Sequence, residues 1–362
     1  MAKVWDLSDA VVRARVEAFW GYCKELLVVE PNALWVNFDE TPLWYSQQSG
    51  RTNVRRLKLR GKRPVRLAGK PGLSRKRITV GLTISNDAAF AAEVPVFVVF
   101  RGDRGRRPDS RQWNEVVIPD GVEARWQERA WMNEDLVLEY ICLFTEARDR
   151  VYGVDRVLVP VWDSFKAHLT DAVKVLCRDS NIKIVVIPRG LTSLLQGLDA
   201  HVNKAFKAYC RAWWRRYASD LEDPEHCVLT NQEFLNLIRD AAADALSLTV
   251  ASGPLQGCNV GCASFLHNGL TNAVDGSEDA LINVRHGAVD PGRRADLPSV
   301  NLAVAAPAAA VAEVDPGYGE QSSDDEVPML DAGDDSAGSE DEGGGWGRGG
   351  AWDHPAHRGR AR

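Results

Sequence analysis

Residues 156–199 read RVLVPVWDSFKAHLTDAVKVLCRDSNIKIVVIPRGLTSLLQGLD, and this stretch decides the fold. Two short apolar runs, at 157–162 and 182–187, flank a segment with apolar residues at helical spacing, which predicts a strand, a helix and a second strand. Nearly continuous apolar runs are typical of strands covered on both faces. We therefore expect a parallel βαβ unit whose ligand-binding edge lies at the carboxyl ends of its strands.

Three aspartates fall where such an edge would form. Asp163 ends the first of these strands, Asp199 stands where the loop meets the next helix, and Asp39 ends an earlier apolar strand at 34–38. Side chains alternate along a strand, so the neighbouring Glu40 is expected on the opposite face. A single Asp at a strand end or helix start is usually a turn or capping residue, and Asp199 is a candidate N-cap. Three of them brought to one edge favour a divalent metal site.

The chemistry of such a set is specific. Mg²⁺ prefers hard oxygen ligands and is usually fixed by one or two carboxylates per ion. Phosphodiester cleavage by two divalent ions needs carboxylates that hold the pair close together. We therefore expect Asp39, Asp163 and Asp199 to bind two Mg²⁺ or Mn²⁺ ions.

Further elements surround the βαβ unit. Amphipathic spacing predicts helices at 8–27, 133–148 and 230–248, and another begins just after Asp199. Residues 78–85 and 94–100 predict an antiparallel pair of strands. Three strands followed by alternating helices and strands indicate an α/β fold. We expect a ribonuclease-H-like mixed five-stranded sheet flanked by helices.

Composition divides the chain into four parts. We expect an N-terminal helix in residues 1–28, the α/β domain in 29–220 and a small helical extension in 221–290. Residues 291–362 are rich in Ala, Pro, Gly, Asp, Glu and Ser, which predicts a disordered acidic and Gly-rich tail.

The overall composition is that of a soluble globular protein. Of the 362 residues, 45% are hydrophobic and 26% are charged, and no apolar run approaches the roughly 20 residues that span a membrane. Seven irregularly spaced cysteines predict reduced thiols rather than a disulfide framework. The net charge of −6 is uneven, because residues 301–362 hold 13 acidic and 4 basic residues. The tail is therefore a candidate to contact basic proteins.

Two segments carry clustered positive charge. Residues 51–77 contain twelve Arg or Lys and no acid, and the helix after Asp199 has basic residues spaced 3, 4 and 4 apart. Solvated surface is the ordinary explanation of each, but like charges without acids among them favour a polyanionic partner. Part of the first segment could also serve as a nuclear-import signal. The expected DNA-binding residues are Arg55, Arg56, Lys58, Arg60, Lys62, Arg63, Lys204, Lys207, Arg211 and Arg215.

Three blocks also carry a family resemblance. NFDETPLW (37–44), VWDSFKAHL (161–169) and IPRGLTSLLQGLDAHVNKAFKAY (187–209) resemble the signature blocks of the DDE superfamily endonucleases. The branch they most resemble is that of the pogo, Jerky and centromere-protein-B-like transposases. The resemblance implies that Asp39, Asp163 and Asp199 are catalytic metal ligands. It matches His168 and Gln196 to family positions beside these ligands, with His168 orienting Asp163, whereas Gly197 replaces the usual Pro.

The resemblance implies a Mg²⁺-dependent DNA endonuclease and strand transferase that acts in the nucleus. One alternative is a domesticated, catalytically inactive nucleic-acid-binding protein, and another is a ribonuclease-H-like nuclease acting on RNA–DNA hybrids or junctions. The family's helix-turn-helix domains are not found ahead of residue 29, which leaves recognition of transposon ends open. The DNA sequence recognised and a homo-oligomeric state are also left open.

Overall fold

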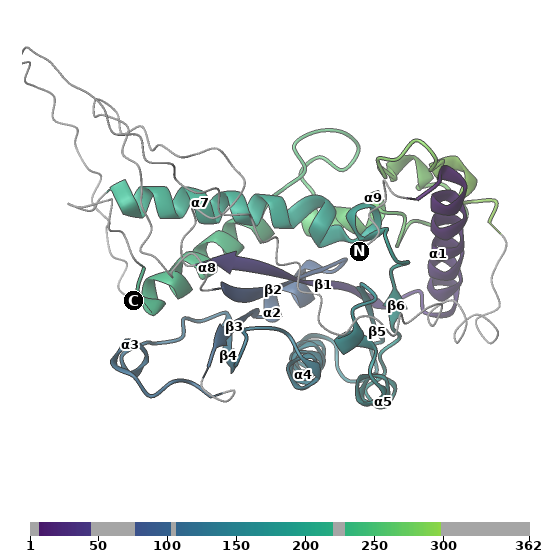
Figure 1. The fold of residues 1–362 in the computed structure, drawn as a ribbon. Helices are drawn as coiled ribbons and strands as arrows, with labels where there is room; N and C mark the ends of the chain where they lie inside the picture. Colours follow the sequence, from purple (N-terminus) through teal and green to yellow (C-terminus); the bar gives the residue numbers. More distant parts are fainter. Residues whose placement is uncertain (1–6, 45–76, 103–105, 220–228, 298–362) are drawn as a thin grey trace, which may run out of the picture. The chain divides into compact units, whose positions relative to one another are not determined.

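The computed structural model describes residues 7–44, 77–102, 106–219 and 229–297 (Figure 1). At its centre is a mixed sheet of six strands in the order β4-β3-β2-β1-β5-β6. The strands are β1 (Leu34–Trp44), β2 (Arg77–Ser85), β3 (Val96–Arg101), β4 (Val122–Gln127), β5 (Leu158–Trp162) and β6 (Val185–Val186). β2 is antiparallel to both β1 and β3, whereas β1 and β5, β5 and β6, and β3 and β4 run parallel. The ribonuclease-H-like α/β prediction is confirmed.

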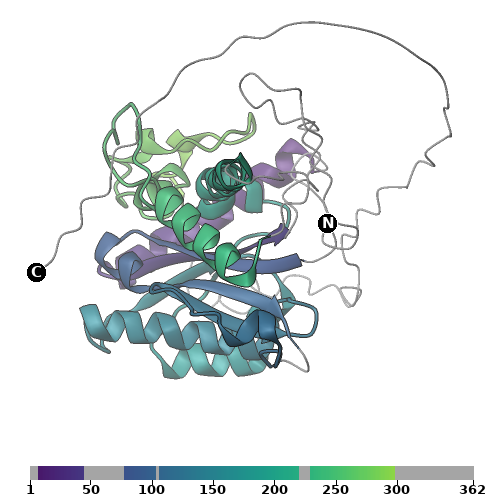
Figure 2. The ribbon, with the colours of Figure 1, turned by 90° about the vertical axis from the view of Figure 1, so that its left-hand side faces the viewer.

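Helices cover both faces of the sheet (Figure 2). They are α1 (Asp9–Val29), α2 (Ala88–Glu93), α3 (Arg111–Asn114), α4 (Glu134–Val151), α5 (Asp171–Asp179), α6 (Thr192–Leu195), α7 (Asn203–Ser219), α8 (Asn231–Leu246) and α9 (Val260–His267). Short helical turns are η3 (Lys166–Leu169), η4 (Leu198–Val202), η6 (Asp279–Leu281) and η7 (Pro291–Arg293). The capping box predicted at the start of α8 is present, between Thr230 and Glu233.

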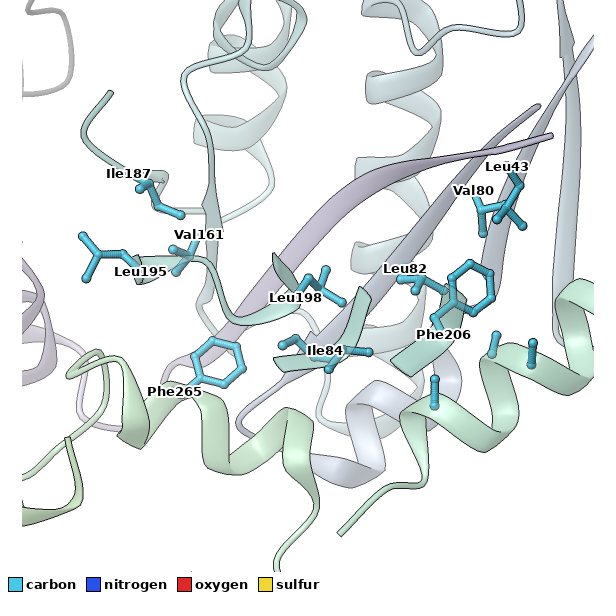
Figure 3. Close-up of a cluster of buried hydrophobic side chains, with 14 of the residues drawn as sticks. Leu43, Val80, Leu82, Ile84, Val161, Ile187, Leu195, Leu198, Phe206 and Phe265 are labelled. Atoms are coloured by element: carbon cyan, nitrogen blue, oxygen red, sulfur yellow. The ribbon is translucent and has the colours of Figure 1, made fainter. Parts of the chain in front are cut away.

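The alternation of side chains along β1 divides the core into two layers. Val36 and Phe38 pack with Tyr140 of α4, while Trp35 belongs to the larger cluster that includes Trp20 of α1. That larger cluster also holds the buried faces of α7, α8 and α9. Figure 3 shows part of it, with Leu82 and Ile84 of β2 beside Leu198 and Phe206. Odd-numbered residues at the end of β1 consequently face α7, and even-numbered residues face α4.

The sheet has six strands where the sequence predicts five. The additional strand, β4, has the sequence VEARWQ, and it extends the sheet beyond β3. Its alternate residues are charged or polar, and Arg125 pairs with Glu123 of the same strand and with Glu139 of α4. The strict alternation of apolar and polar residues is the period-2 pattern of a half-buried strand, so the sequence carries a signal for β4 that a search for apolar runs misses.

The helical extension packs further along the chain than the sequence predicts. Residues 291–297, assigned above to the tail, are part of the packed structure because the side chain of Arg294 is fully buried. Its guanidinium pairs with Asp279 at 2.9 Å and donates to the carbonyl oxygen of Gly269. The predicted disordered tail from 298 to 362 and the predicted DNA-binding residues between 55 and 63 lie outside the described residues. In the ranges that are described, no helix is long and apolar enough to cross a membrane.

Candidate active site

The end of β1 places Asp39 on the α7 face and Glu40 on the α4 face, as the alternation predicts. Asn37, two residues earlier and on the same face as Asp39, is only 1% exposed. Its amide nitrogen donates to the carbonyl oxygen of Val161 in β5 at 2.6 Å. Its amide oxygen accepts the backbone N–H of Leu198 at 2.8 Å. One side chain therefore links the three segments that carry the three acids.

Asn203, at the start of α7, links two of the acids directly. Its amide nitrogen donates to Asp39 Oδ2 at 2.7 Å and to Asp199 Oδ1 at 3.1 Å. Both carboxylates are thus within hydrogen-bond distance of the same nitrogen, although their residues are far apart in the sequence. Asp199 lies inside the helical turn η4, and Gly197 precedes that turn, so the reading of Asp199 as an N-cap is wrong.

The third acid, Asp163, is bonded by His168, which also contacts Glu40 on the α4 face of β1. The Nδ1 atom of His168 is 3.1 Å from Asp163 Oδ1, and its Nε2 atom is 3.2 Å from Glu40 Oε1. The ring is 1% exposed and stacks on Trp162, with centroids 5.2 Å apart. Burial disfavours the charged ring, but the carboxylates of Glu40 and Asp163 raise the pKa of His168 to about 10. His168 therefore lies beside Asp163, as the sequence predicts.

The electrostatics of Asp39 report how closely the acids gather. Burial raises its pKa well above the ordinary range, and the charges of Asp199, Glu40 and Asp163 raise it further. The hydrogen bond from Asn203 acts in the opposite direction. The carboxylate of Asp39 therefore interacts electrostatically with both other predicted ligands, Asp163 after β5 and Asp199 in η4.

The positions and the chemistry of these acids show whether they could bind a divalent cation. Over the described part of the chain, no three His, Cys, Asp or Glu side chains stand in ligand geometry for a metal ion. Two of the predicted ligands instead bond Asn203, and the third bonds His168. The donor set still suits Mg²⁺ or Mn²⁺, because it consists of hard oxygens whose mutual repulsion a cation would relieve.

The segment that carries Asp199 is supported by contacts from α1 and from the residue that follows α9. Asn268, which is 1% exposed and follows α9, donates its amide to the carbonyl oxygen of Leu195 at 3.1 Å. Its own carbonyl oxygen accepts the indole N–H of Trp20 in α1 at 2.8 Å. At Gly197, an added Cβ would lie 2.5 Å from Ser264 Oγ and 2.9 Å from Ile84 Cδ1. This close contact explains why the chain has glycine there.

The other predicted site residues divide into two groups. Gln196 is 1% exposed and belongs to the segment that precedes Asp199, and its role beside the acids stays a prediction. The basic residues of α7 reach solvent to different degrees: Lys204 and Arg215 are exposed, and Lys207 and Arg211 are half-buried. On the opposite face of the helix Trp214 is buried in place of the predicted Trp213, whose indole donates to Asp240 at 3.2 Å.

Sequence reasoning missed the two asparagines and gave Glu40 no role in the site. Asn37 is the one amide in an otherwise apolar strand, directly in line with Asp39, and that position was its signal. Asn203 follows Asp199 by four residues, a spacing that places both on one helical face.

Comparison with known proteins adds independent information. The family model of the DDE superfamily endonuclease matches residues 76–252, which include Asp163 and Asp199 but not Asp39. Two relatives, the Pogo transposable element with KRAB domain of Mus musculus and that of Homo sapiens, are each 30% identical over 181 residues. The match covers 50% of this chain and 27% of each relative, so the chain spans about a quarter of their length.

Solved structures show only distant likeness. The crystal structure of the Mos1 mariner paired end complex with Mn has a TM-score of 0.33 and 12% identity, over 65% of this chain and 61% of that chain. A pre-cleavage Mos1 transpososome has a TM-score of 0.31 and 10% identity, over 64% and 62%. At these TM-scores the likeness carries no functional information. The family model and the two relatives agree: residues 76–252 of this chain are similar to the DDE superfamily endonucleases.

Proposed function

We propose that this chain is the core of a transposase-type endonuclease that cuts and joins DNA strands in the nucleus. In this proposal Asp39, Asp163 and Asp199 bind two Mg²⁺ or Mn²⁺ ions. The family supports the reaction class, and the two relatives named as transposable elements support DNA as the substrate.

One observation carries the proposal. Asp39 and Asp199 bond the same amide nitrogen of Asn203, and Asp163 is close enough to Asp39 to raise its pKa. Placing several carboxylates close together costs free energy, because each negative charge disfavours ionisation of the next. A shared cation is the ordinary reason for such a cluster at a sheet edge.

The protein side chains have distinct parts in this proposal. Divalent ions bound to the acids would activate an attacking water or 3′-hydroxyl and stabilise the leaving oxygen. His168, held by Glu40, fixes the orientation of Asp163. The basic residues of α7 begin at Lys204, five residues after Asp199, and would bind the phosphate backbone of the DNA beside the site.

Nicking of supercoiled DNA tests the proposal. Purified protein should convert supercoiled to open-circular DNA with Mg²⁺ or Mn²⁺ and not with EDTA, and Asp163→Asn should not. DNA binding, measured by fluorescence anisotropy, should survive in Asp163→Asn, because the substitution removes a negative charge that faces phosphates. If both proteins bind DNA and neither nicks it, the enzyme proposal is wrong and the inactive nucleic-acid-binding protein is correct. Preference for a hybrid or junction substrate over duplex DNA would favour the other nuclease.

A further inference from the structure

Asn203 is a buried residue at the start of α7 whose side-chain amide bonds two acids. Its side chain is 6% exposed, and its nitrogen donates to Asp39 and Asp199. Its amide oxygen is buried and has no hydrogen-bond partner among the described residues. Among the described residues, the two bonds to carboxylates are therefore the hydrogen bonds of this side-chain amide, and they set its orientation.

The position of this nitrogen is informative. A donor shared by two carboxylate oxygens keeps the two side chains near each other and fixes the direction in which they point. Groups that hold metal ligands in orientation are commonly hydrogen-bond donors behind the ligands, and their loss weakens metal binding.

We propose that Asn203 is a positioning residue for the divalent site: its amide nitrogen holds the side chains of Asp39 and Asp199 next to each other before the ion binds. This inference rests on the proposed function, since it requires that the two acids bind a divalent ion. It goes beyond it by adding to the site a neutral residue from α7. A helix that also presents basic residues to solvent is thereby connected to the acids through one side chain.

The test is Mn²⁺ binding by the purified full chain, without DNA. After removal of metal with EDTA and dialysis, calorimetry gives the Mn²⁺ affinity, and thermal unfolding gives Tm at each Mn²⁺ concentration. Asn203→Ala should weaken Mn²⁺ binding about 10- to 100-fold, the range found for residues that orient metal ligands. Asn203→Asp should lower Tm without metal and show a larger rise in Tm with Mn²⁺ than the wild type, because it adds a carboxylate to the cluster.

A matched control separates positioning from packing. Asn236→Asp makes the same change on α8, where Asn236 accepts only a bond from Gln232 at 3.4 Å. Its effect on Tm should be the same at every Mn²⁺ concentration. If Asn203→Ala does not fold, Asn203→Ser, which retains one short donor, should still bind Mn²⁺ more weakly than the wild type.

The outcomes distinguish the inference from the proposed function. If Asp163→Ala loses Mn²⁺ binding while the Asn203 variants bind as tightly as the wild type, Asn203 has only a structural role and the inference is overturned. If the wild type shows no Mn²⁺-dependent rise in Tm, or Asp163→Ala keeps the full rise, the proposed metal site itself is wrong.

Discussion

Replacing Asn37 by Ala should destabilise the protein more than an ordinary buried polar substitution in the same sheet. The change removes two buried hydrogen bonds, to Val161 and Leu198, and leaves a carbonyl oxygen and an N–H without these partners. A buried group that loses its partner costs about 1–3 kcal/mol. For two such groups we expect a loss of about 2–6 kcal/mol in the free energy of unfolding. Urea titration followed by tryptophan fluorescence measures it directly.

Ser85→Ala is the matched control for this substitution. Ser85 is also 1% exposed; it donates to the carbonyl oxygen of Trp35 at 2.8 Å and accepts the backbone N–H of Asp87 at 3.1 Å, but neither bond reaches β5 or η4. It should cost about 1 kcal/mol. Asn37→Ala should in addition reduce nicking under conditions where the variant is fully folded, because Asp199 loses its attachment to β1. A loss no larger than that of Ser85→Ala, or unchanged nicking, would refute the linking role of Asn37.

Three further substitutions test separate features. Gly197→Ala should cost about 1–3 kcal/mol by overpacking, measured in urea, and Ser264→Ala in the same chain should recover part of it. Arg294→Met should cost about 3–5 kcal/mol because it leaves the buried Asp279 carboxylate without its cation, and it should lower Tm correspondingly. Lys204→Ala should weaken DNA binding and reduce the slope of log affinity against log salt by about 1, measured by anisotropy.

Each of these has a contrary result. Additive effects of Gly197→Ala and Ser264→Ala would show that the two positions are not in contact. Restoration of stability by Asp279→Asn in the Arg294→Met chain is expected, and failure to restore it would place the cost elsewhere. An unchanged salt slope would remove Lys204 from the DNA interface.

The sequence predicts the fold well where apolar periodicity is strong. The buried strands β1 and β5 and the helices α4 and α8 lie close to their predicted positions for this reason. The short strand β4 is missed by a search for apolar runs, because its residues alternate between apolar and polar. Trp213 and Trp214 are adjacent on α7, and a small rotation of the helix decides which of them is buried.

The candidate site is only partly readable from the sequence. The three acids stand at the ends of predictable elements, so their approach to one edge follows from the fold. The bonds that fix them are different, because Leu198 lies 161 residues from Asn37 and Asn203 lies 164 residues from Asp39. No local pattern encodes partners at such separations. An isolated polar residue in an apolar segment marks only that a partner is needed.

The hydrogen bonds of Asn268 bear on how short a segment of this protein can be transferred to another protein with its site still aligned. The family match ends at residue 252, but Asn268 supports the segment before Asp199 and is itself bonded by Trp20 of the first helix. A gene fusion that carried only the three motif blocks into a new host protein would transfer the acids without the support that aligns them. A transferred piece that keeps this support would have to run from α1 through the segment that follows α9.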